Sequence, residues 1–281
     1  MVRSLPKLGS LFDRAAHILV INARSFAICM SPAVALSLVA WTLKPGALTA
    51  ESIQNSNGDI SAYIRVVYLY AGASSVAAFS QWVCAATVMI GMRWAERGYS
   101  PRPLTWLAIG TRRIPSLLIT FLLPIVPALI PFCLLILTVL DQYRMVGDIN
   151  SFDPASFAAG VQAARQEIWA VALLGLIGVP FSFLATAGVM LGDYTARRAI
   201  RWAMCQTFSR VMGKRVIALS CAVIAVLVAH GMMETVADFA TEYVPSAVII
   251  WHFIEVVADA AFDAYIAAVI ALAWLTEYLA P

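Results

Sequence analysis

Acidic residues recur every four positions near the C-terminal end of the chain, where the sequence is otherwise apolar. Glu255, Asp259 and Asp263 share this spacing, and His252 precedes them. Because side chains four residues apart lie on one face of a helix, the three carboxylates form one stripe. A charge in the middle of a membrane-spanning helix costs about 2.5–3.5 kcal/mol on insertion scales, so such residues usually serve a function. One interpretation of the stripe is therefore a site that binds a cation or relays a proton.

A second acidic series with the same spacing lies just before this stripe. His230, Glu234, Asp238 and Glu242 recur every four residues, and residues 243–246 predict a turn between the two series. Such a turn makes the two helices antiparallel, which allows the two series to face each other. The candidate ion- or proton-binding residues are Glu255, Asp259, Asp263, His252, His230 and Glu234.

Two other interpretations of the acidic stripe remain open. Asp259 and Asp263 can also hold helices together, as structural residues, by hydrogen bonds to polar side chains of the second span: Gln81, Ser74, Ser75 or Ser80. His252, Glu255 and Asp259 can also be combined into a divalent metal site. Their spacing lacks the E-x-x-H pattern of paired carboxylate–histidine sites in helical bundles, so we predict no metal site.

The sequence contains no motif of a known catalytic centre. It lacks the G-x-S-x-G, H-E-x-x-H, P-loop and dinucleotide-binding patterns. The five cysteines lie in apolar stretches without a C-x-x-C spacing, which is typical of small apolar packing residues. We therefore expect no enzymatic activity, no catalytic residue and no cofactor.

Composition indicates that lipid is the solvent of most of this chain. Of its 281 residues, 62% are hydrophobic and 12% are charged, whereas a soluble domain has about 25% charged residues. A membrane-spanning helix needs about 20 mostly apolar residues. Six runs meet this requirement: 25–43, 66–92, 117–140, 168–191, 216–233 and 246–279. The sequence therefore predicts an all-α membrane protein with six transmembrane helices.

Basic residues concentrate at alternate ends of these six runs. Fifteen of the nineteen lie in the N-terminal segment, between the second and third spans, or between the fourth and fifth spans. By the positive-inside rule these segments, and hence both termini, are cytoplasmic. We expect a multi-pass protein of a bacterial inner membrane. The basic excess follows from topology, so it does not indicate nucleic-acid binding.

The basic segments also mark a threefold internal repeat of two-helix units. Arg24, Arg113 and Arg215 each lie between an amphipathic helix and a span. The first amphipathic helix has an apolar stripe of Leu8, Leu11, Phe12, Ala15 and Leu19. The third has a similar stripe of Ile200, Ala203, Met204, Phe208 and Val211. The units cover about residues 1–98, 99–194 and 195–281.

Amphipathic basic helices of this kind lie in the cytoplasmic membrane interface, with apolar side chains among acyl chains and arginines near phosphates. The alternative is that they are cytoplasmic extensions of the spans, bent at Pro115 or Gly213. The candidate residues for binding lipid headgroups are Arg14, Arg24, Arg112, Arg113, Arg197, Arg198, Arg201 and Arg215.

Short motifs in the first and third units resemble a known family. They are LFDRA at 11–15, NAR at 22–24, GD at 192–193 and GKR at 213–215. This arrangement is similar to the six-helix membrane domain found beside some bacterial glycerophosphodiester phosphodiesterases, and to its stand-alone YciC-like relatives. The resemblance implies a six-helix membrane fold over most of the chain. The phosphodiesterase domain has no counterpart in this sequence, so we do not expect its reaction.

These features predict a non-enzymatic membrane protein that organises membrane lipid or acts as an accessory or scaffold subunit in the envelope. Its expected partners are membrane lipids, mainly anionic ones, and a protein in the membrane. The alternative is a transporter or channel-like protein with a cation or proton site on the acidic face of the last helix.

Overall fold

All regular secondary structure in the described part of the chain is helical. The computed structural model describes residues 8–43, 60–123, 133–134, 137, 178, 181–209, 212–225, 228, 248–276 and 278. Its main helices are α1 (Leu8–Ile21), α2 (Ala23–Thr42), α4 (Ile60–Glu96), α5 (Pro103–Arg112), α6 (Ile114–Leu122), α10 (Ala196–Phe208) and α12 (Val248–Leu275). Two shorter helices cover Phe181–Met190 and residues 213–225. The predicted all-α class is confirmed for these residues.

Three helices are long and apolar enough to cross a membrane. They are Ala23–Thr42 in α2, Tyr68–Glu96 in α4 and Ile249–Leu275 in α12. These helices confirm that the first, second and sixth predicted spans are apolar helices. The predicted spans 117–140, 168–191 and 216–233 are described only in part, so six spans and three two-helix units stay a prediction.

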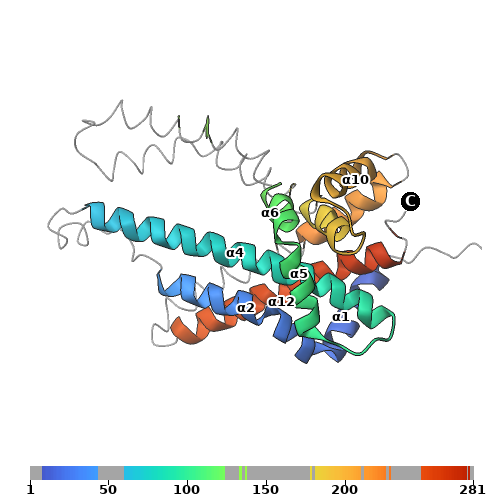
Figure 1. The fold of residues 1–281 in the computed structure, drawn as a ribbon, viewed down its shortest axis with the longest axis horizontal. Coiled ribbons are helices and arrows are strands. Elements are labelled where there is room, and N and C mark those ends of the chain that lie inside the picture. The colour runs from blue at the N-terminus through green and yellow to red at the C-terminus, as the bar shows by residue number, and fades with distance from the viewer. Residues whose placement is uncertain are drawn as a thin grey trace, which may run out of the picture.

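Helix α4 is the longest of these helices and the one on which the other two pack. It has 37 residues, which corresponds to about 55 Å at 1.5 Å per residue. That length exceeds the roughly 30 Å of a bilayer's hydrocarbon core, so α4 is longer than one upright span requires. Helices α2 and α12 lie along α4 and also contact each other (Figure 1).

Three short helices gather where α2 begins and where α4 and α12 end (Figure 1). We call α1, α5 and α10 the basal helices. The Arg14 guanidinium of α1 lies 2.5 Å from a carboxylate oxygen of Glu96, the last residue of α4. The rings of Trp202 in α10 and Trp274 in α12 lie 4.4 Å apart. These contacts fix the basal helices to one end of the three long helices.

Helix α5 packs against the core through a buried tryptophan, which lies opposite a glycine of α4. The Trp106 side chain is 1% exposed, and its ring lies 5.6 Å from the ring of Phe26 in α2. A Cβ atom at Gly91 in α4 would lie 2.8 Å from both rings. Small residues let helices approach closely in membrane proteins, and Gly91 provides the space that the two rings fill.

The apolar stripe of α1 packs against protein. Leu11 is 1% exposed and Ala15 is fully buried, and α1 contacts α12 through Phe12 and Tyr265, whose rings lie 5.9 Å apart. The prediction that Leu11 and Ala15 face acyl chains is therefore wrong. The stripe has the same helical periodicity whether it faces lipid or protein. Only the tertiary structure shows that α12 packs against it.

Candidate functional site

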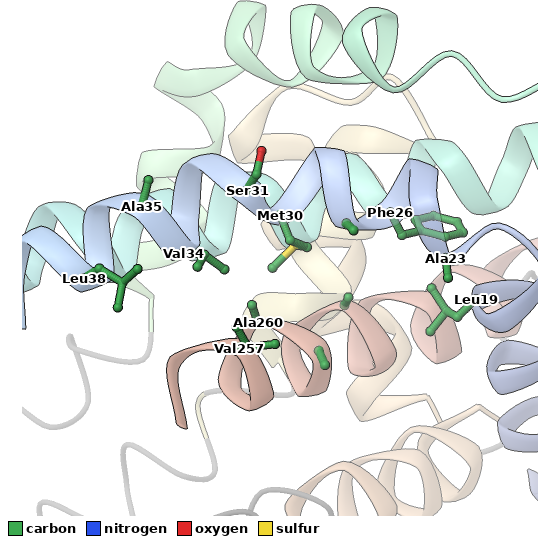
Figure 2. A pocket seen from close by; sticks show the side chains of 13 residues that line it. Leu19, Ala23, Phe26, Met30, Ser31, Val34, Ala35, Leu38, Val257 and Ala260 are labelled. Carbon is green, nitrogen blue, oxygen red and sulfur yellow. The ribbon is translucent and has the colours of Figure 1, made fainter. Parts of the chain in front are cut away.

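A lateral apolar groove runs between α2 and α12 (Figure 2). Its volume is about 510 Å³, and twelve of its thirteen lining residues are apolar. The exception is Ser31, whose hydroxyl donates a hydrogen bond to the carbonyl oxygen of Ile28 at 2.9 Å. Pro32 has no N–H to bond that carbonyl, and hydroxyls commonly replace such missing bonds in membrane helices. The groove therefore offers a ligand almost no polar surface.

Small side chains on α12 hollow out one wall of the groove. This wall is made of Val257, Ala260, Ala261 and Ala264. Residues three and four apart share a helix face, so these positions form one shallow strip. Ala260 and Ala264 are buried and form the floor, whereas Ala261 is exposed at the rim.

The opposite wall is formed by α2. Larger side chains lie deep in the groove on this side, and small exposed ones line its opening. Met30 is buried deep in the groove, while Ala27 and Ala35 are exposed along its opening. Both walls lie in helices apolar enough to span a membrane. The opening is therefore in the same apolar surroundings as the exposed faces of those helices.

The two ends of the groove differ in polarity. One end reaches Leu19 of α1 and Ala23, and the exposed Arg24 follows directly. Arg24 lies seven residues before Ser31, so both share one stripe of α2. At the other end, beyond Leu38, the ring of Trp41 stacks on His252 with 4.6 Å between the ring centroids.

The predicted acidic stripe lies on the other side of α12 from the groove, by helical geometry. His252 Nδ1 lies 2.8 Å from an Oε atom of Glu255, so these two predicted site residues are brought together. Asp259 and Asp263 are half-buried one and two turns further on. His230 and Glu234 lie outside the described residues. Within the described residues no group of three His, Cys, Asp or Glu side chains could hold a metal ion.

Ser75 does not act as the predicted hydrogen-bond donor to this stripe. Its hydroxyl donates to the carbonyl oxygen of Ala71 in its own helix at 2.8 Å. This bond accounts for the single proton of the Ser75 hydroxyl.

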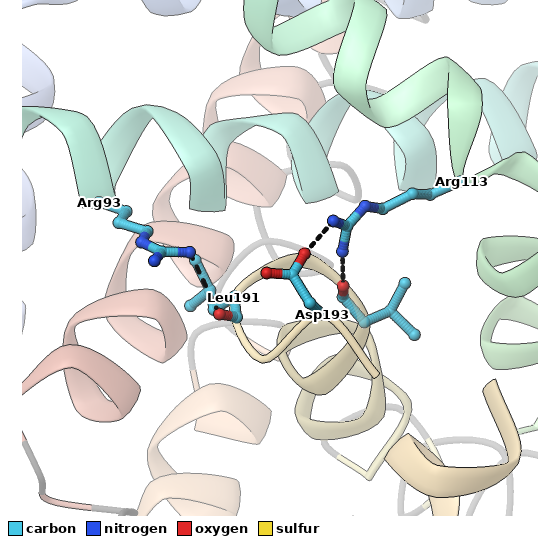
Figure 3. Close-up of polar contacts among 5 residues, drawn as sticks. Arg93, Arg113, Leu191 and Asp193 are labelled. Atoms are coloured by element: carbon cyan, nitrogen blue, oxygen red, sulfur yellow. Dashed lines mark hydrogen bonds and ion pairs between the residues drawn. The ribbon is translucent and has the colours of Figure 1, made fainter. Parts of the chain in front are cut away.

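Two arginines hold the turn that follows the Phe181–Met190 helix (Figure 3). Arg113 donates hydrogen bonds to the Val189 carbonyl oxygen and to the Asp193 carboxylate. Arg93 Nη1 donates to the Leu191 carbonyl oxygen at 3.3 Å. Carbonyls at the C-terminal end of a helix lack intrahelical partners and attract cations. Arg113, predicted to bind a lipid headgroup, therefore bonds protein groups in this structure.

Three other predicted headgroup residues also contact protein. Arg14 pairs with Glu96 as described above, and Arg215 Nη1 donates to the Tyr278 carbonyl oxygen at 3.2 Å. The Arg198 guanidinium lies 4.5 Å from the centroid of the Tyr194 ring, a cation–π distance. The other four predicted headgroup residues are exposed, and their side chains make no hydrogen bond or ion pair with the described residues: Arg24, Arg112, Arg197 and Arg201.

The exposed face of α10 combines two of these arginines with apolar side chains. Arg197, Arg201, Met204 and Phe208 follow the spacing of a single helical face. Met204 is 48% and Phe208 80% exposed. The opposite face of α10 is small and buried: Ala196, Ala199, Ala203 and Gln206. The exposed face is therefore basic in its first half and apolar in its second.

The groove is the feature that sequence reasoning missed. Its only signal is the run of small residues at Val257, Ala260, Ala261 and Ala264. The same pattern is typical of packed interfaces between membrane helices. The sequence alone therefore cannot distinguish an open groove from a close helix–helix contact at these positions.

Comparisons of the chain with protein-family models, with curated proteins and with solved structures give no match.

Proposed function

We propose that this chain is a non-enzymatic membrane protein that binds anionic lipid at its basal end, organising membrane lipid or acting as an accessory or scaffold subunit. The exposed face of α10 carries the proposal, because it sets Arg197 and Arg201 beside Met204 and Phe208. This is the composition of an interfacial helix, whose apolar side chains enter the acyl boundary while arginines meet phosphates.

Electrostatics favours such a position for α10. A basic residue close to an anionic leaflet contributes about 1 kcal/mol to the attraction. Arg197 and Arg201 have no carboxylate partner in the described part of the chain, so their charges are free for phosphate. Arg113 and Arg215, in contrast, already bond backbone carbonyls. The proposed headgroup residues are therefore narrowed to Arg24, Arg112, Arg197 and Arg201.

The proposed topology has the basal helices on the cytoplasmic side of a bacterial inner membrane, with both termini there. The gathering of the basal helices at the shared end of α2, α4 and α12 supports it (Figure 1). The proposal also includes six spans arranged as three two-helix units. It further includes membership of the YciC-like membrane-domain family.

Retention of anionic lipid by detergent-purified protein tests the function. Changing Arg197→Gln together with Arg201→Gln should lower co-purified phosphatidylglycerol several-fold, because the charges that meet phosphate are removed. Lysine at both positions should retain most of it. Arg65→Gln is the matched control, since Arg65 is an exposed arginine near the opposite end of α4. Equal retention by the glutamine variant and wild type would exclude α10 as the lipid-binding surface.

A second proposal is transport of a cation or proton by the acidic face of α12. It is favoured by Asp259 and Asp263, which are half-buried one turn apart inside a helix apolar enough to span a membrane. Changing both to asparagine should abolish a pH- or cation-dependent flux in proteoliposomes. Wild-type vesicles that show no flux of protons or alkali cations would rule this proposal out.

A further inference from the structure

We propose that the groove between α2 and α12 holds one acyl chain of a membrane phospholipid, with the phosphate of that lipid at Arg24. The inference rests on the proposed lipid-binding function and assigns a specific site within it. It concerns a different part of the molecule from α10, so the two can be tested separately.

The groove has the length of an acyl chain. It runs along α2 from Ala23 to Leu38, which is fifteen residues or about 22 Å of helix. One leaflet contributes roughly 15 Å to the hydrocarbon core, so a chain entering from one leaflet occupies most of the groove. The volume of about 510 Å³ lies within the roughly 300–1,000 Å³ of ligand-binding sites.

The groove is smaller than a helix of a partner protein. A helix segment about 22 Å long and about 10 Å wide occupies about 1,700 Å³, about three times the volume of about 510 Å³ of the groove. A single hydrocarbon chain is the membrane component whose shape is long and thin enough.

The chemistry of the walls selects the same occupant. A polar ligand would leave its hydrogen-bonding groups without partners, because the only polar side chain, Ser31, already bonds Ile28. The opening, with Ala27, Ala35 and Ala261 along its rim, lies between two helices that suit a membrane interior. Acyl chains are therefore the material that reaches it from the side.

Charge at one end of the groove orients the lipid. Arg24 is exposed, follows the lining residue Ala23, and shares a stripe of α2 with Ser31. A guanidinium binds phosphate oxygens through charge-assisted hydrogen bonds. The end near Leu38 instead leads to the stacked rings of Trp41 and His252. The headgroup is therefore placed at the α1–α2 junction and the chain methyl near Leu38.

A phosphatidylglycerol with a diazirine in one acyl chain tests the assignment. The full chain is reconstituted with this probe, extracted into detergent and purified by gel filtration, so that loosely bound lipid is removed before irradiation. Peptide mapping should then place adducts on groove residues such as Met30, Val34 and Ala261. Equal labelling of Leu69 and Val76, exposed apolar residues of α4 outside the groove, would overturn the proposal.

Filling the groove provides the matched comparison. Ala27→Phe with Ala261→Phe adds two rings at exposed lining positions and should lower the adduct at least tenfold. Ala71→Phe with Ala78→Phe adds the same two rings at exposed positions of α4 and should leave it unchanged. Both proteins must elute as single species on gel filtration. An unchanged adduct in the filled variant, or a dimer that replaces lipid in native mass spectrometry, would contradict an acyl-chain site.

Two further variants test the headgroup position at Arg24 independently of the proposed lipid binding by α10. Arg24→Gln should reduce the retained probe several-fold without moving the adducts. Arg197→Gln with Arg201→Gln should leave the groove adducts in place. Loss of the adducts in that double variant would show that the groove has no site of its own. Adducts that survive while α10 shows no lipid retention would leave the groove assignment standing and remove the α10 proposal alone.

Discussion

The turn at 191–194 and the exposed face of α10 are neighbours in the chain, yet they place arginine in different environments. At the turn, Arg93 and Arg113 bond carbonyl oxygens and the Asp193 carboxylate, so their charges act within the protein (Figure 3). On α10, Arg197 and Arg201 bond no described residue. An arginine beside a predicted span can therefore bond the protein's own carbonyl oxygens, as Arg113 does, or have no partner among the described residues, as Arg197 does.

The largest expected effect comes from removing the arginine of the turn. Arg113→Ala leaves the Val189 carbonyl and the Asp193 carboxylate without their donor. Hydrogen bonds to charged groups contribute about 1.5–3 kcal/mol each, and Asp193 is exposed enough to recover water. We therefore expect a loss of about 2–3 kcal/mol, seen as a drop of about 5 °C or more in the detergent-solubilised Tm.

Arg112→Ala is the control for this prediction. Arg112 is the neighbouring exposed arginine and bonds no described residue, so its removal should change the unfolding free energy by less than about 0.5 kcal/mol. Similar losses for both variants would show that the destabilisation by Arg113→Ala does not come from the Arg113 contacts at the turn.

A smaller effect is expected from the acid of the turn. Asp193 has φ 54°, in the left-handed region, which asparagine tolerates about as well as aspartate. Asp193→Asn therefore keeps the backbone and removes only the charge that faces Arg113. Its side chain is 68% exposed, so the ion pair is worth about 0.5 kcal/mol.

Asp13→Asn on α1 serves as the control for Asp193→Asn, because Asp13 is an exposed acid outside the turn. It should leave the Tm unchanged. A loss above about 2 kcal/mol in Asp193→Asn would mean that the carboxylate, rather than the Val189 carbonyl, is the main partner of Arg113.

The predicted parts of the fold are those that depend on local sequence. Apolar runs of about 20 residues predict membrane-spanning helices without any knowledge of their neighbours, and α2, α4 and α12 are long and apolar enough to be such helices. The environment of α1 could not be predicted in this way. Its stripe at Leu11 and Ala15 suits lipid or protein equally, and only the position of α12 decides between them.

The candidate site depends on tertiary structure for the same reason. Ala260, Ala261 and Ala264 are identical in the sequence, but two are buried and one is exposed at the rim of the groove. The sequence instead predicted a site at Asp259 and Asp263, on the other side of α12. A carboxylate in an apolar run has a large cost of membrane insertion whatever its neighbours are, so it can be recognised from the sequence alone. A groove between two helices has no such signal in either helix alone.

Raising the salt concentration should distinguish the exposed arginines of α10 from Arg113 at the turn. It is the prediction with the smallest expected change in Tm. Raising the ionic strength from 0.1 to 1 M shortens the Debye length from about 10 Å to about 3 Å. Exposed charges on α10 are then screened, so co-purified anionic lipid should fall several-fold. The Arg113 contacts are partly buried, with 27% of the Arg113 side chain exposed, and salt screens partly buried pairs less than exposed ones, so the Tm should shift by less than about 2 °C. Lipid retention that resists salt would place the binding energy in the apolar groove rather than in Arg197 and Arg201.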